Sequence, residues 1–137
     1  MSKEQEGRAA LKQACLGVLE AACIMHPAGH QSKLAARYVL IADDGERVGL
    51  MFEKGPNSPA NLWMRADHAS RIEDLGIARR DYPAADLYAA IDEKGRPIYG
   101  RHAALRQMRE LANADLVRFE IDQSDQLFAV CQHLKGI

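Results

Sequence analysis

The chain has 137 residues, of which 47% are apolar and 27% are charged, and 18 basic residues against 19 acidic ones give a formal charge of -1. This composition is that of a globular domain, and it excludes a disordered or fibrous protein. The near-zero net charge excludes nucleic-acid binding through bulk electrostatics, although a local basic patch is still allowed. We therefore expect one domain over residues 1–137.

The N-terminal stretch MSKEQEGR mixes acids and bases and is not followed by a long apolar run. It does not resemble a signal or transit peptide. The most apolar stretch, residues 14–25, is too short to span a bilayer and contains Glu20. The sequence thus predicts a cytoplasmic protein without a membrane segment.

The three cysteines are Cys15, Cys23 and Cys131, and they form no CxxC pair. On one helix Cys15 and Cys23 would lie about 12 Å apart, too far for a disulfide. Buried free thiols are the expectation.

The first half of the chain alternates strong helix and strand signals. Apolar residues recur at helical spacing until Pro27 ends the pattern. ARYVLIA and RVGLMFE flank DDGE, whose Asp-Gly step favours a hairpin. GPNSPAN has turn composition, and LWMRAD alternates in the manner of a strand. The predicted elements are a helix over residues 5–25 and strands over 36–42, 47–53 and 62–67.

The second half is less regular. Residues 68–83 are ambiguous, with a short helix over 70–75 as one interpretation. DLYAAI reads as a strand, EKGRP as a turn, LVRFEI as a half-buried strand, and Ser124 as the N-cap of a last helix that closes at Lys135 and Gly136. The predicted elements are strands over residues 86–91 and 116–121 and helices over 101–112 and 124–135.

This order of elements predicts an α+β domain, with a mainly antiparallel sheet of about five strands. The N-terminal helix, the helix near 101–112 and the C-terminal helix would pack on the sheet. Only the stretches 55–61 and 67–85 exceed hairpin length, and long loops are where sites usually lie.

The helix expected over residues 101–112 carries its charge in the unfavourable direction. Bases crowd its start, whereas a helix N-terminus favours acids. A bound anion would remove the conflict, because backbone N–H groups and guanidinium groups would converge on it. The alternative is that these bases pair with acids such as Asp86, Asp92 or Asp115, or face solvent. The candidate binding residues are Arg96, Arg101, His102, Arg106 and Arg109.

Trp63, the only tryptophan, shares a predicted strand face with Arg65 and Asp67. Because its neighbours on that face are polar, the face is predicted to lie outside the core. Trp63 and Arg65 are therefore candidates for stacking on a planar ligand. The alternative is that Trp63 covers a core edge or fills an interface.

Motifs for catalysis or metal binding are absent from the sequence. The order of elements resembles restriction-endonuclease-like nucleases, but Glu53 and Lys54 are adjacent and lie roughly 20 Å along the hairpin from the acids of DDGE. Pro27 separates His26 from His30, so CIMHPAGH lacks helical metal-ligand spacing. We expect no metal and no cofactor. If the protein is an enzyme, the first suspects are Asp67, His68, Tyr99 and His102.

Two functions follow as alternatives. The first is a small binding or regulatory domain that engages an anionic ligand, a phosphate or a nucleic-acid backbone, through the basic helix start. The second is a protein-protein interaction module or homodimer whose basic flank meets an acidic partner or its own acidic patch near Asp43, Asp44 and Glu46.

Overall fold

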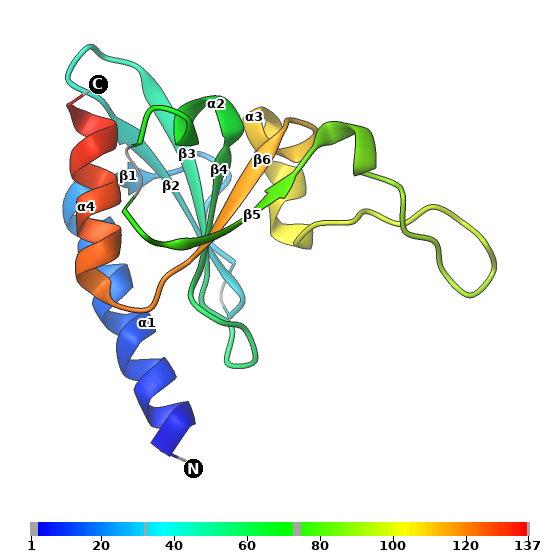
Figure 1. The fold of residues 1–137 in the computed structure, drawn as a ribbon, viewed down its shortest axis with the longest axis horizontal. Coiled ribbons are helices and arrows are strands. Elements are labelled where there is room, and N and C mark those ends of the chain that lie inside the picture. The colour runs from blue at the N-terminus through cyan, green and yellow to red at the C-terminus, as the bar shows by residue number, and fades with distance from the viewer. Residues whose placement is uncertain (1–2, 32, 73–74, 137) are drawn as a thin grey trace.

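The computed structural model describes residues 3–31, 33–72 and 75–136. In these residues four α-helices, two short 3₁₀ segments and six strands follow one another (Figure 1). The helices are α1 (Lys3–Ala22), α2 (Ala66–Ala69), α3 (Arg109–Ala112) and α4 (Ser124–Lys135), and the 3₁₀ segments are η1 (Ala84–Asp86) and η2 (Ala103–Gln107). The strands are β1 (Ile24–Met25), β2 (Ala35–Ile41), β3 (Arg47–Glu53), β4 (Asn61–Arg65), β5 (Ala78–Tyr82) and β6 (Leu116–Glu120).

The strands form one antiparallel sheet in the order β1-β2-β3-β4-β6-β5. This confirms the predicted α+β class and the mainly antiparallel sheet, with six strands where about five were expected. The hairpin of β2 and β3 is confirmed as well. Its turn places Gly45 at a φ of 88°, a conformation that glycine adopts without steric cost.

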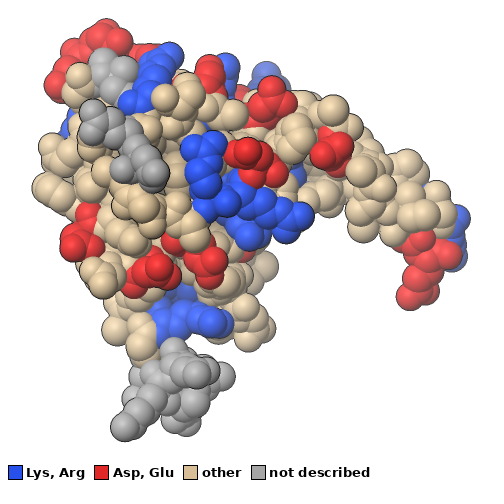
Figure 2. Space-filling model, in the orientation of Figure 1, with Lys and Arg blue, Asp and Glu red and all other residues tan. Residues whose placement is uncertain are grey.

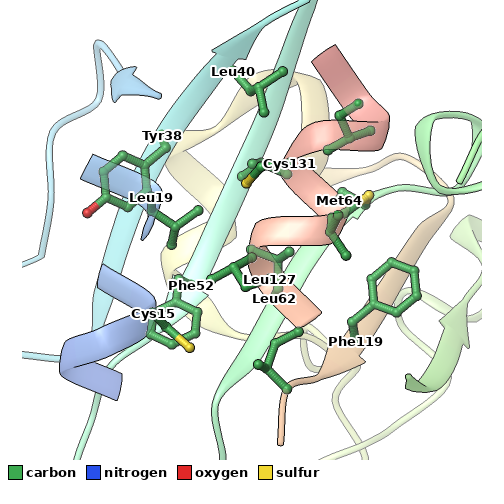
Figure 3. Packing of buried hydrophobic residues seen from close by; sticks show 14 of the residues in the cluster. Cys15, Leu19, Tyr38, Leu40, Phe52, Leu62, Met64, Phe119, Leu127 and Cys131 are labelled. Carbon is green, nitrogen blue, oxygen red and sulfur yellow. The ribbon is translucent and has the colours of Figure 1, made fainter. Parts of the chain in front are cut away.

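Helices α1 and α4 cover one face of the sheet (Figure 1). Alternate strand residues point to this face, among them Leu50, Phe52, Leu62 and Met64. They pack against Cys15 and Leu19 of α1 and against Leu127, Val130 and Cys131 of α4 (Figure 3). This is the main core, and most of its side chains are fully buried.

The opposite face of the sheet holds a smaller core. Met51 of β3, Trp63 of β4 and Leu116 of β6 alternate with the main-core residues and so point the other way. Segments η2 and α3 cover them with Ala104, Leu105, Met108 and Leu111. The prediction that the Trp63 face lies outside the core is therefore wrong, because short helical segments cover that face too.

Residues 101–112 do not form the single helix that was predicted. They form η2 and α3, separated by Met108 in an extended conformation with φ -98° and ψ 91°. The carbonyl of Ala104 accepts from the side chain of Arg37 at 3.0 Å, and the N–H of Met108 bonds to Leu105 instead. A helix continues only while each carbonyl accepts from the residue four positions later. The hydrogen bond from Arg37 therefore lies at the point where the helical segments η2 and α3 are interrupted.

One strand prediction is wrong, and one strand was not predicted. Strand β5 lies at 78–82, inside the stretch interpreted as ambiguous, and residues 86–91 form no strand. β5 is an edge strand and its residues are mostly exposed, so the alternation of apolar and polar residues that identifies a half-buried strand is missing. A helical turn appears at 66–69 rather than 70–75, and residues 73–74 lie outside the described part of the chain.

The ends of the main helices differ slightly from the predictions. α1 stops at Ala22 because Ile24 and Met25 turn into β1 and pair with β2. The N-cap of α4 is Gln123 rather than Ser124, and Gln123 and Gln126 form a reciprocal capping box. No helix in the described part of the chain is long and apolar enough to cross a membrane.

All three cysteines are free thiols, as predicted. Cys15 is fully buried, and burial raises its pKa to about 11. Interaction with the thiol of Cys131, together with burial, raises the pKa of Cys23. A thiol with a raised pKa is a poor nucleophile at neutral pH, so neither Cys15 nor Cys23 has the properties of a catalytic cysteine.

Candidate functional site: the arm and its anchor

Residues 83–100, here called the arm, project away from the sheet beyond β5 (Figure 1). The arm leaves the body after Tyr82 and returns to it at Arg101. Most of its residues are exposed. Because it reaches beyond both cores, its conformation depends on its own hydrogen bonds and on its attachment at the base.

A tight turn closes the tip of the arm. The N–H of Asp92 donates to the carbonyl of Arg96 at 2.9 Å, and Gly95, at φ 77°, donates to Asp92 at 3.0 Å. The carboxylate of Asp92 accepts from the backbone N–H groups of Lys94 and Arg96 and from Arg96 Nε, each at 2.9 Å. The Arg96 N–H, above all, lowers the pKa of Asp92. This bears out the turn predicted in EKGRP.

The two legs of the arm are joined along their length. Ile98 donates to Ala90 at 3.0 Å, Gly100 donates to Leu87 at 2.9 Å, and Ile91 forms a β-bridge with Pro97. Gly100 matters for this approach, because a Cβ there would lie 3.3 Å from the Leu87 carbonyl oxygen. The arm is thus a narrow hairpin rather than an irregular loop.

Arg101 anchors the base of the arm. It is only 9% exposed. Its Nη1 donates to the carbonyls of Leu111 and Ala112 at 3.3 and 3.2 Å, and its Nη2 donates to the carbonyl of Tyr82 at 2.6 Å. One guanidinium therefore ties together the end of β5, the end of α3 and the returning leg of the arm.

The position of Arg101 resolves the apparent charge conflict. Leu111 and Ala112 are the last residues of α3, so no later residue of that helix donates to their carbonyls, although the Leu111 carbonyl also accepts from the N–H of Ala114 at 3.2 Å. A cation is favourable at a helix C-terminus. Arg101 precedes the helical segments in sequence, but folding back places it at the C-terminal end of α3, where its charge has the stabilising sign.

The other predicted anion-binding residues have separate surroundings. Arg96 pairs with Asp92 at the tip of the arm, and His102 caps η2 by accepting from the N–H of Ala104 at 3.1 Å. Arg106 lies over the ring of Tyr99 at 4.7 Å. Arg109 is the exposed first residue of α3. The structure therefore spreads these residues from the tip of the arm to α3.

Trp63 and Arg65 are not brought together as a ligand platform. Trp63 is 2% exposed, packs against the ring of Tyr82 and donates from Nε1 to Glu53 at 2.7 Å. Arg65 pairs with Asp67 at 2.8 Å near the surface. Trp63 thus lies in the smaller core, which agrees with the alternative interpretation that it covers a core, and its buried ring is closed to a planar ligand.

The suspects for catalysis occupy structural positions. Asp67 and His68 belong to α2, where Asp67 pairs with Arg65 and His68 Nε2 lies 3.2 Å from Glu46. Tyr99 donates to the carbonyl of Ala112 at 2.7 Å, at the base of the arm. Across residues 3–31, 33–72 and 75–136, no three histidine, cysteine or acidic side chains form a group that could hold a metal ion.

The feature that sequence reasoning missed is the exposed apolar surface of the arm. Tyr88, Ile91 and Ile98 are 53%, 62% and 43% exposed. The run DLYAAI is predicted to be a strand, which assumes a neighbouring strand in the sheet to pair with it. The signal lay in its position between the turn residues of 83–86 and 92–97, which isolate it from the sheet.

A cleft of about 390 Å³ lies between β5 and the base of the arm. Arg80, Asp81 and Tyr82 line it from the strand, and Asp86, Leu87 and Ala90 line it from the arm. Figure 2 shows acidic and basic side chains gathered at the far end of the arm, where Asp92 and Glu93 are followed by Lys94 and Arg96. Both the cleft and the tip therefore present charges of both signs.

Comparison with protein-family models, with curated proteins and with solved structures yields no match for this chain.

Proposed function

We propose that this domain is a protein-protein interaction module that pairs with a second copy of itself through the arm. The observation that carries the proposal is an ordered hairpin whose large apolar side chains face solvent. Tyr88, Ile91 and Ile98 pack on neither core. Apolar groups held in a fixed, protruding arrangement are typical of a surface that a partner covers.

The order within the arm supports binding. Its legs, its tip and its base are all fixed by hydrogen bonds, from Asp92 at one end to Arg101 at the other. Ordering a flexible loop on association reduces affinity, and a loop that is already ordered avoids that loss. The hydrogen bonds of the arm therefore favour a contact role over a passive linker.

The charges support a second copy as the partner. In a two-fold pair the same surface meets itself in reverse direction. Two arms packed in this way place the tip of one beside the base cleft of the other. Glu93 would then approach Arg80 of the second copy, while Lys94 would approach its acidic cleft residue Asp86.

The alternative, an anion bound at a basic helix start, has weaker support. That hypothesis rests on a continuous helix over residues 101–112, and this helix is absent. It also needs the guanidinium of Arg101, which is committed to three carbonyl groups. The acidic patch near Asp43, Asp44 and Glu46 is instead the partner expected in the interaction-module hypothesis, and its Glu46 contacts Arg71 and His68.

Replacing Ile91 and Ile98 together with serine tests the proposal. In sedimentation equilibrium we expect the unmodified protein to form dimers and the double variant to dissociate at least about 100-fold more readily, since each dimer loses four apolar side chains. The free energy of unfolding of the monomer should change little, because both side chains are exposed.

Phe128→Ser is the matched control. Phe128 is 55% exposed on α4, outside the arm, so its loss should leave the dimer intact. The proposal is wrong if the protein stays monomeric at all concentrations up to about 1 mM. This concentration is far above the dissociation constants of ordinary homodimers. The proposal is equally wrong if dimers persist unchanged in the arm variant.

A further inference from the structure

A second surface, remote in sequence from the arm, contains a cavity whose lining is mostly cationic and polar. A cavity of about 340 Å³ lies between the first half of α1 and the turn that joins β3 to β4. Its lining comprises three cationic residues, two neutral polar ones and two small apolar ones. They are Arg8, Lys12, Lys54, Gln13, Asn57, Ala9 and Pro56. No carboxylate is among them.

The three cations are arranged at some cost in stability. Arg8 and Lys12 are four residues apart on α1, so they lie on the same side of the helix and repel each other. The third, Lys54, approaches from the β3–β4 turn. In the described part of the chain, no acidic side chain forms an ion pair with any of the three.

Lys12 is the most buried of the three, at 5% exposed. Its ammonium donates one hydrogen bond, to the carbonyl of Gly55, whereas an ammonium group has three donors. The nearby carboxylate of Glu53 is engaged by the indole N–H of Trp63 at 2.7 Å. Burial and the charge of Arg8 lower the pKa of Lys12, while the charge of Glu53 opposes this. The protein itself therefore offers the buried ammonium of Lys12 one hydrogen bond and no ion pair among the described residues.

We propose that this cavity binds a small organic anion through its phosphate or carboxylate group. Lys12 would meet the anionic group, and Arg8 and Lys54 would flank it. Ala9 and Pro56 supply apolar contact for the organic part. The volume lies at the lower end of the range typical of small-molecule sites, which suits a ligand carrying one or two small rings. This inference is independent of the arm.

Titration calorimetry with phenyl phosphate, benzoate and the uncharged benzyl alcohol tests the proposal. We expect saturable binding of at least one of the two anions and none of the alcohol. The double variant Arg8→Gln, Lys54→Gln should bind that anion at least about tenfold more weakly, because two charge-assisted contacts are lost. These two residues carry the test because Lys12→Met also removes the bond to Gly55 and can unfold the local structure.

The control is Arg47→Gln, Arg109→Gln, which changes the net charge equally at two exposed positions outside both the cavity and the arm. It should leave the affinity unchanged. Three results would each overturn the proposal: no saturable binding of either anion up to about 10 mM, well above the range of specific sites; binding of the alcohol as tight as that of the anions; or an equal loss of affinity in the control. Preference for phenyl phosphate or for benzoate then identifies the anionic group.

Discussion

Replacing Arg37 with alanine is expected to lower the free energy of unfolding by about 3 to 5 kcal/mol. Arg37 is 4% exposed and donates to the carbonyls of Ala104 and Gly29 and to Gln107 Oε1, at 3.0, 2.9 and 2.9 Å. No described carboxylate pairs with it, and burial lowers its pKa. The substitution leaves the buried carbonyl of Ala104 and the part-buried acceptors of Gly29 and Gln107 without this donor, and it removes a buried side chain between the sheet and η2.

Urea denaturation followed by circular dichroism measures this loss. Arg47→Ala is the matched control, because Arg47 lies in the adjacent strand β3 but is exposed, and it should change stability by less than about 0.5 kcal/mol. Equal effects of the two substitutions would contradict the role assigned to Arg37. An Arg37→Ala protein that is as stable as the unmodified protein, with the smaller core unchanged, would also contradict this role.

Replacing Arg101 with alanine is expected to cost about 2 to 4 kcal/mol and to free the base of the arm. Three carbonyl groups, those of Tyr82, Leu111 and Ala112, lose their guanidinium partner. Hydrogen exchange at the amides of Ile98 and Gly100, which join the legs of the arm, should become faster. The variant should also form dimers less readily, because the ordering of the arm would then accompany association.

Arg106→Ala is the control that distinguishes the loss of the Arg101 hydrogen bonds from the loss of one positive charge. It removes the same charge close by, but Arg106 is exposed and only lies over the Tyr99 ring, so the cost should stay below about 1 kcal/mol. Arg101→Lys should give an intermediate result, because one ammonium does not reproduce the planar fork of a guanidinium. Unchanged amide exchange in Arg101→Ala would show that the arm does not depend on this anchor.

Much of the fold could be predicted because the relevant signals are local. The helical period of residues 5–22, the Asp-Gly turn at 44–45 and the alternation in 116–120 each depend on neighbouring residues, and each was found. Strand β5 was missed for a physical reason. An edge strand with exposed charged residues such as Arg79, Arg80 and Asp81 has no buried face to impose a period on its sequence.

The candidate site was harder to predict because it depends on contacts between distant residues. The run of bases at 101–109 is visible in the sequence, but the groups that these bases contact in the folded protein are not. Arg101 reaches the end of α3 only after the chain folds back, and Arg37, far away in β2, takes up the Ala104 carbonyl where the predicted helix would continue. Exposure of Ile91 and Ile98 depends equally on which strands the sheet places beside them.

Methyl nuclear magnetic resonance of isoleucine side chains at increasing protein concentration tests the role of the arm most directly. Among the isoleucines that the structure describes, four are exposed: Ile91 and Ile98 in the arm, Ile24 in β1 and Ile41 in β2. If two arms pair, the methyl signals of Ile91 and Ile98 shift with concentration while those of Ile24 and Ile41 stay in place. Shifts confined to Ile24 and Ile41, or no shift at any of the four, would contradict self-association through the arm.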